Sequence, residues 1–364
     1  MKGTVLVLTN FLAGLHSFRK EVMKAIIDEG YQLYISVPDT DDNRIEYFKS
    51  IGCHIIKTDF NRRGMNPIDD LRLMLKYRKF IKDLKPKAVL SYTIKPNVYG
   101  GIACRLTRTP LIANVTGLGD AIENGGWLQK LTVALYKIGI GKAKQVFFQN
   151  PSNKETCLKY GIADDKAIVL PGSGVNLEYH TFQDYPDDGV IKFLYIARLQ
   201  KDKGTSEYFE AAKAIKEKYP QTEFQVLGWK DGEYERQLNE LTATGIIKYL
   251  GTTSDVRPFL KDIHCTIMPS YHEGMSNVNL ESAANGRPVI TTNVPGCRET
   301  VEDGVSGFYC EAKRAESLTA AIERFIALPW EEKKKMGEKG RKKVEKEFDR
   351  QIVVKAYMDA INKL

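Results

Sequence analysis

The chain has 364 residues, of which 43% are hydrophobic and 27% charged, and its formal net charge is +8. These values are typical of a globular protein of two ordinary domains, and the lack of any run of about 18 apolar residues excludes a transmembrane helix. Residues 1–180 carry 26 basic and 17 acidic side chains, whereas residues 181–364 carry 28 and 29, so we expect an anionic partner on the N-terminal half.

The cysteines predict a reducing compartment. None belongs to a Cys-x-x-Cys pair, and most lie in apolar segments, so we expect free buried thiols instead of disulfides. The N-terminal segment lacks the long apolar core and the cleavage site of a signal peptide, and we expect a first strand there. The six cysteines are Cys53, Cys104, Cys157, Cys265, Cys297 and Cys310.

The N-terminal half alternates short apolar segments with longer amphipathic ones. The apolar segments predict strands, and the amphipathic segments predict helices, for example residues 18–29 and 69–84. This alternation is typical of parallel strands joined by right-handed crossovers. The predicted strands are residues 5–8, 31–37, 54–58, 88–91, 111–115, 145–148 and 167–170.

Residues 171–189 are rich in Gly, Asp, Pro and Asn and are predicted as a linker. After them the alternation restarts, and residues 331–364 are expected to form two charged helices. We therefore predict an α/β protein with two doubly wound, Rossmann-like domains that face each other across a ligand-binding cleft. The expected divisions are residues 1–175, residues 176–345 and a C-terminal helix, 346–364, that packs back toward the first domain. The predicted strands of the second domain are residues 193–197, 223–227, 249–251, 265–268, 289–292 and 307–309.

Two charged clusters follow strands of the C-terminal half. Arg198 and Lys203 come after the predicted strand 193–197. Glu273 follows the predicted strand 265–268, and Glu281 lies about two turns into the predicted helix 277–284. Because ligands of open α/β sheets bind at the carboxyl ends of the strands, we expect the two clusters to converge on one crevice.

The chemistry of these clusters indicates a nucleotide sugar. Carboxylates accept hydrogen bonds from hydroxyls, and the N-terminus of the helix 277–284 is a ready site for an anion. A ligand with hydroxyls at both ends and phosphates in the middle suits this arrangement. From the spacing alone, a solvated loop glutamate and a surface helix glutamate remain an open alternative.

The same residues resemble family 4 of the retaining glycosyltransferases, which have the GT-B fold. The resemblance rests on three motifs and runs through essentially the whole chain. The segment Pro295-Gly296-Cys297-Arg298-Glu299, with Glu302-Asp303-Gly304-x-x-Gly307, adds to it. Residues 17–19, 93–100 and 116–119 are similar to a subgroup that builds bacterial surface polysaccharides or lipid-linked oligosaccharides. The three motifs are Arg198-x₄-Lys203-Gly204, Glu273-Gly274-x₆-Glu281 and Gly286-x-Pro288-Val289-Ile290.

The resemblance implies a role for each residue. Arg198 and Lys203 would hold the donor diphosphate, because two cations neutralise the developing charge of the leaving group. Glu273 would accept hydrogen bonds from the sugar hydroxyls, and Glu281 from the ribose. No cofactor and no metal is expected; the donor is expected to be a UDP-sugar. The other implied donor contacts are Gly274, the amides of Met275, Ser276 and Asn277, the base-reading loop at Thr252, and Gly14, which would let an N-terminal loop approach the diphosphate.

One position departs from the family pattern. Many members have a histidine where this chain has Thr116. The resemblance then implies that the donor phosphate takes the acceptor proton on the front face, with Thr116 or Asp120 orienting the acceptor. A glycine turn that only ends a strand is an equal alternative at residues 116–119. The Asp-x-Asp of residues 39–41 is interpreted as a solvated loop, and the five histidines show no metal-ligand spacing.

The basic N-terminal half indicates contact with anionic lipid. The predicted helix 69–84 and residues 127–144 combine basic with apolar side chains, as amphipathic helices at a membrane surface do. A solvated charged helix face is the alternative. Nucleic-acid binding is disfavoured, because no known module is present and the aromatic residues are not interleaved as stacking platforms. The residues predicted to face the acceptor or the membrane are His16, Arg62, Arg63, Arg78, Lys79 and Lys95.

The leading hypothesis is a peripheral glycosyltransferase at the inner face of the cytoplasmic membrane. It would move a hexose or N-acetylhexosamine to a polyprenyl-diphosphate-linked or other glycan acceptor. A UDP-N-acetylglucosamine 2-epimerase with the GT-B fold and a non-catalytic sugar-binding subunit remain alternatives. An NAD-dependent oxidoreductase is disfavoured, because residues 9–14 lack a G-x-G-x-x-G motif.

Overall fold

The computed structural model describes residues 2–38, 42–62, 64, 66–117, 126–230 and 232–364. The chain divides into an N-terminal unit, Met1–Ser173 with Arg350–Leu364, and a C-terminal unit, Gly174–Asp349. The C-terminal segment of the N-terminal unit therefore starts four residues later than the expected division at 346.

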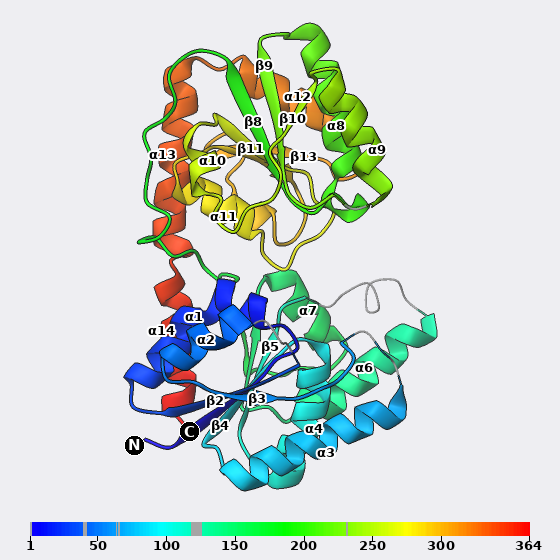
Figure 1. Ribbon diagram of the computed structural model, residues 1–364, viewed down its shortest axis with the longest axis vertical. Coiled ribbons are helices and arrows are strands. Elements are labelled where there is room, and N and C mark those ends of the chain that lie inside the picture. Colours follow the sequence, from blue (N-terminus) through cyan, green and yellow to red (C-terminus); the bar gives the residue numbers. More distant parts are fainter. Residues whose placement is uncertain (1, 39–41, 63, 65, 118–125, 231) are drawn as a thin grey trace. The chain divides into compact units, whose positions relative to one another are not determined.

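The N-terminal unit is built on a parallel sheet of seven strands. Its order is β3-β2-β1-β4-β5-β6-β7, and Figure 1 shows helices on both of its faces. Every neighbouring pair is parallel, as the alternation of strands and helices predicts. The strands are β1 Thr4–Leu8, β2 Gln32–Val37, β3 His54–Lys57, β4 Ala88–Tyr92, β5 Leu111–Val115, β6 Gln145–Phe148 and β7 Ala167–Val169.

Alternate side chains of these strands enter two separate cores. Val5 and Val7 of β1 pack with α1, α2 and α14 on one face, whereas Leu6 and Leu8 pack with α3, α4, α6 and α7 on the other. Because successive strand side chains point to opposite faces, a strand buried on both sides must be apolar throughout. The helices are α1 Leu12–Asp28, α2 Asp42–Ser50, α3 Pro67–Leu84, the π-helix η1 Pro96–Gly100, α4 Gly101–Thr107, α6 Gly126–Ile140, α7 Pro151–Lys159 and α14 Arg350–Asn362.

The C-terminal unit repeats this architecture with six parallel strands. The order is β10-β9-β8-β11-β12-β13. Its largest core lies between one face of the sheet and the helices α8, α9 and α12, with α13 contributing Met336. The strands are β8 Ile191–Ile196, β9 Thr222–Leu227, β10 Ile247–Tyr249, β11 Cys265–Met268, β12 Val289–Thr292 and β13 Gly307–Cys310. The helices are η2 Lys201–Lys203, α8 Thr205–Lys218, α9 Gly232–Ala243, α10 Arg257–Lys261, α11 Asn277–Ala284, η3 Arg298–Thr300, α12 Ala315–Ile326 and α13 Trp330–Glu347.

Several predicted boundaries differ from the structure. Helix α1 begins at Leu12 instead of residue 18, and β10 ends at Tyr249 instead of residue 251. Residues 174–189 are not a linker, because they belong to the C-terminal unit. Arg287, which is fully buried, donates hydrogen bonds from its guanidinium to the carbonyls of Gln183 and Asp184. Polar composition alone cannot show that such backbone carbonyls are satisfied by a distant side chain.

Candidate functional site

The two predicted charged clusters meet in the C-terminal unit. Lys203 Nζ lies 2.7 Å from Glu273 Oε1, and both side chains are only 17% exposed. The Ser270 hydroxyl donates a second hydrogen bond, 3.0 Å long, to the same carboxylate oxygen. A carboxylate and an ammonium, 70 positions apart in sequence, therefore share one partly buried position at the carboxyl ends of β8 and β11.

Gly204 and the adjoining backbone explain why these loops approach so closely. Gly204 has φ +69°, and a Cβ atom there would collide with the carbonyl of Pro269. The Tyr271 amide donates a 2.9 Å hydrogen bond to the carbonyl of Asp202. Glycine at 204 is needed both for its left-handed backbone and for the approach of the two chains.

A third loop supports Glu273; the sequence counted it toward the family resemblance but gave no contact between it and Glu273. Gly296, after β12, has φ +82°, and a Cβ atom there would collide with the carbonyl of Glu273. Its carbonyl accepts a 2.7 Å hydrogen bond from the Ser276 amide, and its amide donates to Glu299 Oε2 at 2.7 Å. Its place in the segment Pro295-Gly296 directly after a strand was the available signal.

The start of α11 corrects part of the predicted donor site. The Ser276 amide, predicted to face the ligand, is already bonded to Gly296, and the Ser276 hydroxyl accepts from the Asn279 amide as the N-cap. Met275 is buried in a core with Leu280, so its side chain is structural. Gly274 precedes α11 and Asn277 is its first residue, so both lie at the N-terminal, positive end of the helix dipole.

Arg198 and Thr252 are exposed on loops after β8 and β10. No hydrogen bond or ion pair joins the Arg198 side chain to any of the residues that the structure describes. The Gly251 carbonyl accepts a 2.8 Å hydrogen bond from the Gly228 amide, which ties the loop of Thr252 to the end of β9. Glu281 lies on α11 with its side chain 22% exposed, and Oε1 is 4.0 Å from His180 Nε2.

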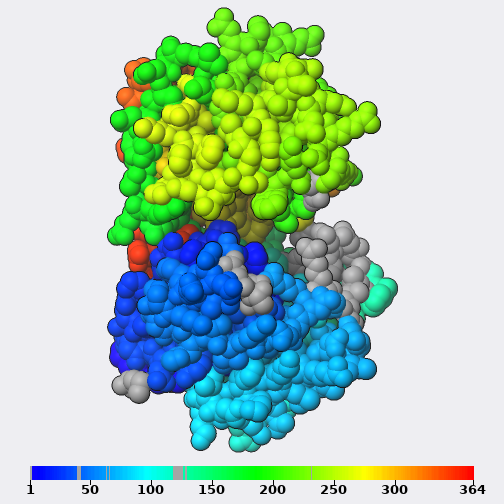
Figure 2. Space-filling view, in the orientation of Figure 1, coloured from blue at the N-terminus to red at the C-terminus, as the bar shows by residue number. Residues whose placement is uncertain are grey.

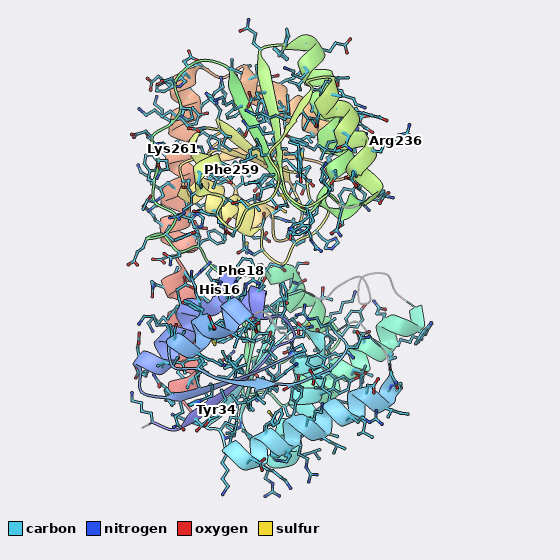
Figure 3. The ribbon with its side chains drawn as sticks, viewed as in Figure 1. His16, Phe18, Tyr34, Arg236, Phe259 and Lys261 are labelled. Carbon is cyan, nitrogen blue, oxygen red and sulfur yellow. The ribbon has the colours of Figure 1, made fainter. Side chains whose placement is uncertain are left out.

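In the N-terminal unit, Gly14 lies in the first turn of α1, so its predicted place in a loop was wrong. A Cβ atom at Gly14 would approach the Phe11 ring to 2.9 Å, and the Arg62 guanidinium lies 5.0 Å from the centre of that ring. His16, labelled in Figure 3 on α1, packs edge-on against Tyr47 with ring centres 4.6 Å apart. A neighbouring aromatic ring is therefore what Gly14 accommodates within this unit.

Lys95 is held in a buried ion pair. Its Nζ lies 2.6 Å from Asp70 Oδ1, with the two side chains 13% and 12% exposed. The Tyr99 hydroxyl donates to Asp70 Oδ2 at 2.7 Å, and burial, followed by this bond to Asp70, raises the pKa of Tyr99. The Lys95 ammonium is thus occupied by Asp70, which the sequence analysis did not foresee.

Thr116 directly follows β5 and is half-buried. Nearby strand ends carry polar atoms that sequence reasoning missed: the register places Tyr92 beside Asn114, and the side-chain amide of Asn114 finds no hydrogen-bond partner in the described part of the chain. Thr93 follows Tyr92 with φ +73°, which is strained for a β-branched residue. Arg63, Asp120 and the Asp39–Asp41 loop lie outside the described residues.

Arg78 and Lys79 lie on α3, where Lys79 forms an exposed pair with Asp83 at 2.7 Å. Within the described ranges, every helix is too short or too polar to cross a bilayer. Among the same residues, no cluster of three His, Cys, Asp or Glu side chains is placed to bind a metal.

All six cysteines are free and buried, which confirms the expected thiols. Burial raises the pKa of Cys297 to about 12, with the Glu273 carboxylate adding to the shift and Lys203 opposing it. This thiol therefore stays neutral beside the Lys203–Glu273 pair.

Two family models account for most of the chain. The model "Glycosyl transferases group 1" matches residues 180–343, and "Glycosyl transferase 4-like" matches residues 6–150. The first match contains the Lys203–Glu273 pair, and the second contains strands β2 to β6 and most of β1 of the N-terminal sheet.

Two curated relatives are similar over nearly their whole length. The N,N'-diacetylbacillosaminyl-diphospho-undecaprenol alpha-1,3-N-acetylgalactosaminyltransferase of Campylobacter jejuni is 27% identical over 85% of this chain and 86% of its own. The capsular polysaccharide biosynthesis glycosyltransferase CapM of Staphylococcus aureus is 27% identical over 88% and 87%. Among solved structures, Anabaena HepE in complex with UDP and glucose superposes with a TM-score of 0.80 at 17% identity, covering 100% of both chains. The chain belongs to the family 4 glycosyltransferases with the GT-B fold, and it is a glycosyltransferase.

Proposed function

We propose that this protein transfers a hexose or N-acetylhexosamine, with retention, from a UDP-sugar to a polyprenyl-diphosphate-linked saccharide in bacterial surface polysaccharide synthesis. The observation that carries the proposal is the contact between Lys203 and Glu273 beside the start of α11. One place thereby offers a cation for phosphate, a carboxylate for sugar hydroxyls and a helix N-terminus.

The proposed roles follow from these positions. Arg198, exposed and not bonded within the described chain, and Lys203 bind the diphosphate and neutralise the charge that develops as the leaving group departs. Binding of the diphosphate separates Lys203 from Glu273, which then accepts hydrogen bonds from the sugar. Glu281 binds the ribose, and the loop of Thr252 contacts the base.

The acceptor chemistry is proposed without a protein general base. The donor phosphate takes the acceptor proton on the front face, while Thr116 or Asp120 orients the acceptor. Because Arg198 and Lys203 supply the positive charge, we propose that the reaction needs no metal. Treatment with EDTA should leave turnover largely unchanged; complete loss that Mg²⁺ restores would contradict this part.

The relatives support the choice of substrate class. The name of the Campylobacter enzyme describes a diphospho-undecaprenol acceptor, and HepE has been crystallised with UDP-glucose. The name of CapM describes capsular polysaccharide biosynthesis. We extend UDP-sugar and lipid-linked acceptor to this chain on that basis.

A membrane-facing surface on the N-terminal unit is part of the proposal. Helix α3, which lies at the face shown in Figure 2, exposes Ile68, Leu71 and Leu75 at helical spacing. The basic side chains of Arg72, Lys76 and Lys79 lie among them. On α6, Trp127, Leu131 and Ile138 are also exposed. An apolar strip with basic neighbours suits the interface of an anionic bilayer.

A cavity next to this helix is a candidate place for acceptor phosphates. It has a volume of about 540 Å³ and is lined by Arg72 and Lys76 of α3 together with Asp59, Phe60 and Asn61 after β3. Arg62 continues the same loop, and Arg63 follows it in sequence.

The main experiment measures sugar transfer from a panel of nucleotide sugars to a polyprenyl-diphosphate-linked saccharide. We expect transfer from a UDP-sugar with the anomeric configuration retained, which NMR of the product would show. Each donor is also incubated alone, because a 2-epimerase would convert the sugar without an acceptor. Donor binding without transfer to any acceptor would favour a non-catalytic sugar-binding subunit.

Membrane contact is tested by flotation with vesicles that contain phosphatidylglycerol. Arg78→Glu combined with Lys79→Glu should weaken binding, and Leu71→Ser with Leu75→Ser should do the same without changing charge. The matched control is Lys213→Glu with Lys261→Glu, two exposed lysines of the C-terminal unit. Equal binding by all variants would remove the membrane surface from the proposal.

A further inference from the structure

We propose that His180 is a positioning residue that orients the Glu281 carboxylate toward the ribose hydroxyls of a nucleoside diphosphate. The inference rests on the proposed function, because it concerns the same donor site. His180 lies in the segment that was predicted to be a linker, but it is only 6% exposed. Its Nε2 atom lies 4.0 Å from Glu281 Oε1.

The hydrogen bonds of Asn285 determine which nitrogen of His180 carries the proton. One side-chain atom of Asn285 lies 2.7 Å from the backbone carbonyl oxygen of Glu281. Because a carbonyl oxygen can only accept a hydrogen bond, this Asn285 atom must be the donor, the amide nitrogen Nδ2. The same atom lies 3.1 Å from His180 Nδ1, which must therefore be the acceptor. The neutral ring then carries its proton on Nε2, the atom that faces Glu281.

The ring of His180 is held in place from several sides. Arg341 Nη1 donates to the carbonyls of both His180 and Ala284 at 2.7 Å, which fixes the segment to the end of α11. Asn285 is itself buried, and the Tyr179 ring packs edge-on at 5.1 Å. The imidazole is thus held in a fixed position, and the Glu281 side chain is the more exposed of the two, at 22% against 8%.

A small movement of Glu281 completes the interaction. The 4.0 Å distance between His180 Nε2 and Glu281 Oε1 is too long for a hydrogen bond. An approach of about 1 Å would bring these two atoms to hydrogen-bonding distance. A carboxylate bonded by one oxygen to a fixed donor keeps further lone pairs for other donors. Two neighbouring ribose hydroxyls, both able to donate, match an acceptor oriented in this way.

The test compares UDP and GDP with their 2′- and 3′-deoxy counterparts as competitive inhibitors of transfer. We expect wild-type enzyme to prefer the nucleoside diphosphate with the intact ribose by about tenfold or more, as for a hydrogen bond to a charged group. His180→Phe keeps a ring but removes the donor, and should reduce that preference severalfold while kcat stays nearly unchanged. His180→Gln places an amide N–H near the position of Nε2 and should restore most of it.

Glu281→Gln separates the possible outcomes. In the proposed arrangement it removes the ribose preference, and adding His180→Phe to it causes no further loss. Retention of the wild-type preference by His180→Phe would overturn the inference, as would failure of His180→Gln to restore it when its melting temperature matches wild type. Retention by Glu281→Gln, with transfer still occurring, would overturn the ribose role while leaving the proposed function intact. Absence of any transfer by wild type would overturn the proposed function itself.

Discussion

Two lysine–carboxylate pairs, one in each unit, have nearly the same geometry but different surroundings. Lys95 and Asp70 in the N-terminal unit are 2.6 Å apart, and Lys203 and Glu273 in the C-terminal unit are 2.7 Å apart. Both pairs are mostly buried. In the N-terminal pair, Lys95 and Tyr99 occupy the two different oxygens of Asp70, whereas Lys203 and Ser270 both lie on Oε1 of Glu273.

The difference shows how one kind of contact can serve structure or binding. Asp70 receives a donor on each oxygen from its own chain, which joins α3 to η1 and the residue before it and is what a structural pair requires. Glu273 lies where the loops that follow the parallel strands β8, β11 and β12 meet. Two of these loops contain a glycine with positive φ, Gly204 and Gly296. Sheet ends of this kind are where ligands bind. We infer that the Lys95–Asp70 pair maintains the fold. We infer also that the contact between Lys203 and Glu273 is replaced by contacts with the substrate when it binds.

The largest expected effect comes from breaking the C-terminal pair. Lys203→Ala or Glu273→Ala should lower the rate of transfer by roughly 100-fold or more, because each removes a group directed at charge or hydroxyls in the transition state. Cooperative unfolding should be retained. The matched control is Lys201→Ala, an exposed lysine of the same short helix. Near wild-type turnover in both pair variants would refute the assignment.

Breaking the N-terminal pair should act on stability instead. Lys95→Met leaves the Asp70 carboxylate buried without its cation, and the free energy of unfolding should fall by about 3 kcal/mol. Urea unfolding of Lys82→Met, an exposed lysine on α3, provides the comparison. A loss of transfer without a loss of stability would show instead that Lys95 acts on the acceptor, as the sequence analysis expected.

Gly204→Ala tests whether the two loops must touch. It combines a left-handed backbone, which costs about 1–2 kcal/mol for alanine, with a clash against the Pro269 carbonyl. We expect a loss of stability beyond the backbone cost and a clear loss of transfer. Gly245→Ala is the matched control, because its φ is +72° but no atom lies within 4 Å of its Cβ position. Equal effects of the two changes would mean that the contact is unimportant.

The smallest expected effect concerns the thiol near the C-terminal pair. Burial raises the pKa of Cys297 from 9.0 to about 12. Between these values only the unfolded chain loses the proton, so the stabilisation is complete below pH 9 and is lost as pH rises toward 12. At pH 9.5 this thiol should lower the free energy of unfolding by less than about 1 kcal/mol. The free energy of unfolding, measured in urea at pH 7.5 and at pH 9.5, should decrease less between the two for Cys297→Ala than for wild type.

Parts of the fold follow from local sequence patterns. The predicted strands 265–268 and 289–292 and the predicted helix 277–284 have the bounds that the structure shows. The start of α1 was missed because Gly14 lowers local helix propensity and the N-cap residue, Phe11, has no capping side chain, while tertiary packing of Leu12 and Leu15 favours the helix.

The site was only partly accessible to sequence reasoning. Glu273, Lys203 and Arg198 were predicted as site residues because each follows a strand in a recognisable motif, and the structure brings Lys203 and Glu273 into contact. The supporting role of Gly296, the Asp70–Tyr99 contact around Lys95 and the His180–Asn285 pair were missed. Each of these depends on residues that are distant in sequence or on a segment whose composition indicated a linker.

The sequence by itself determined the alternation of strands and helices, the parallel sheets and the type of each charged residue, because apolar periodicity and motif spacing are local properties. Only the tertiary structure decided which charge meets which partner: Lys203 contacts Glu273, Lys95 contacts Asp70, and His180 faces Glu281. The physical reason is that electrostatic and hydrogen-bond partners are fixed by how strand ends and helices pack in space, across tens of residues of intervening chain.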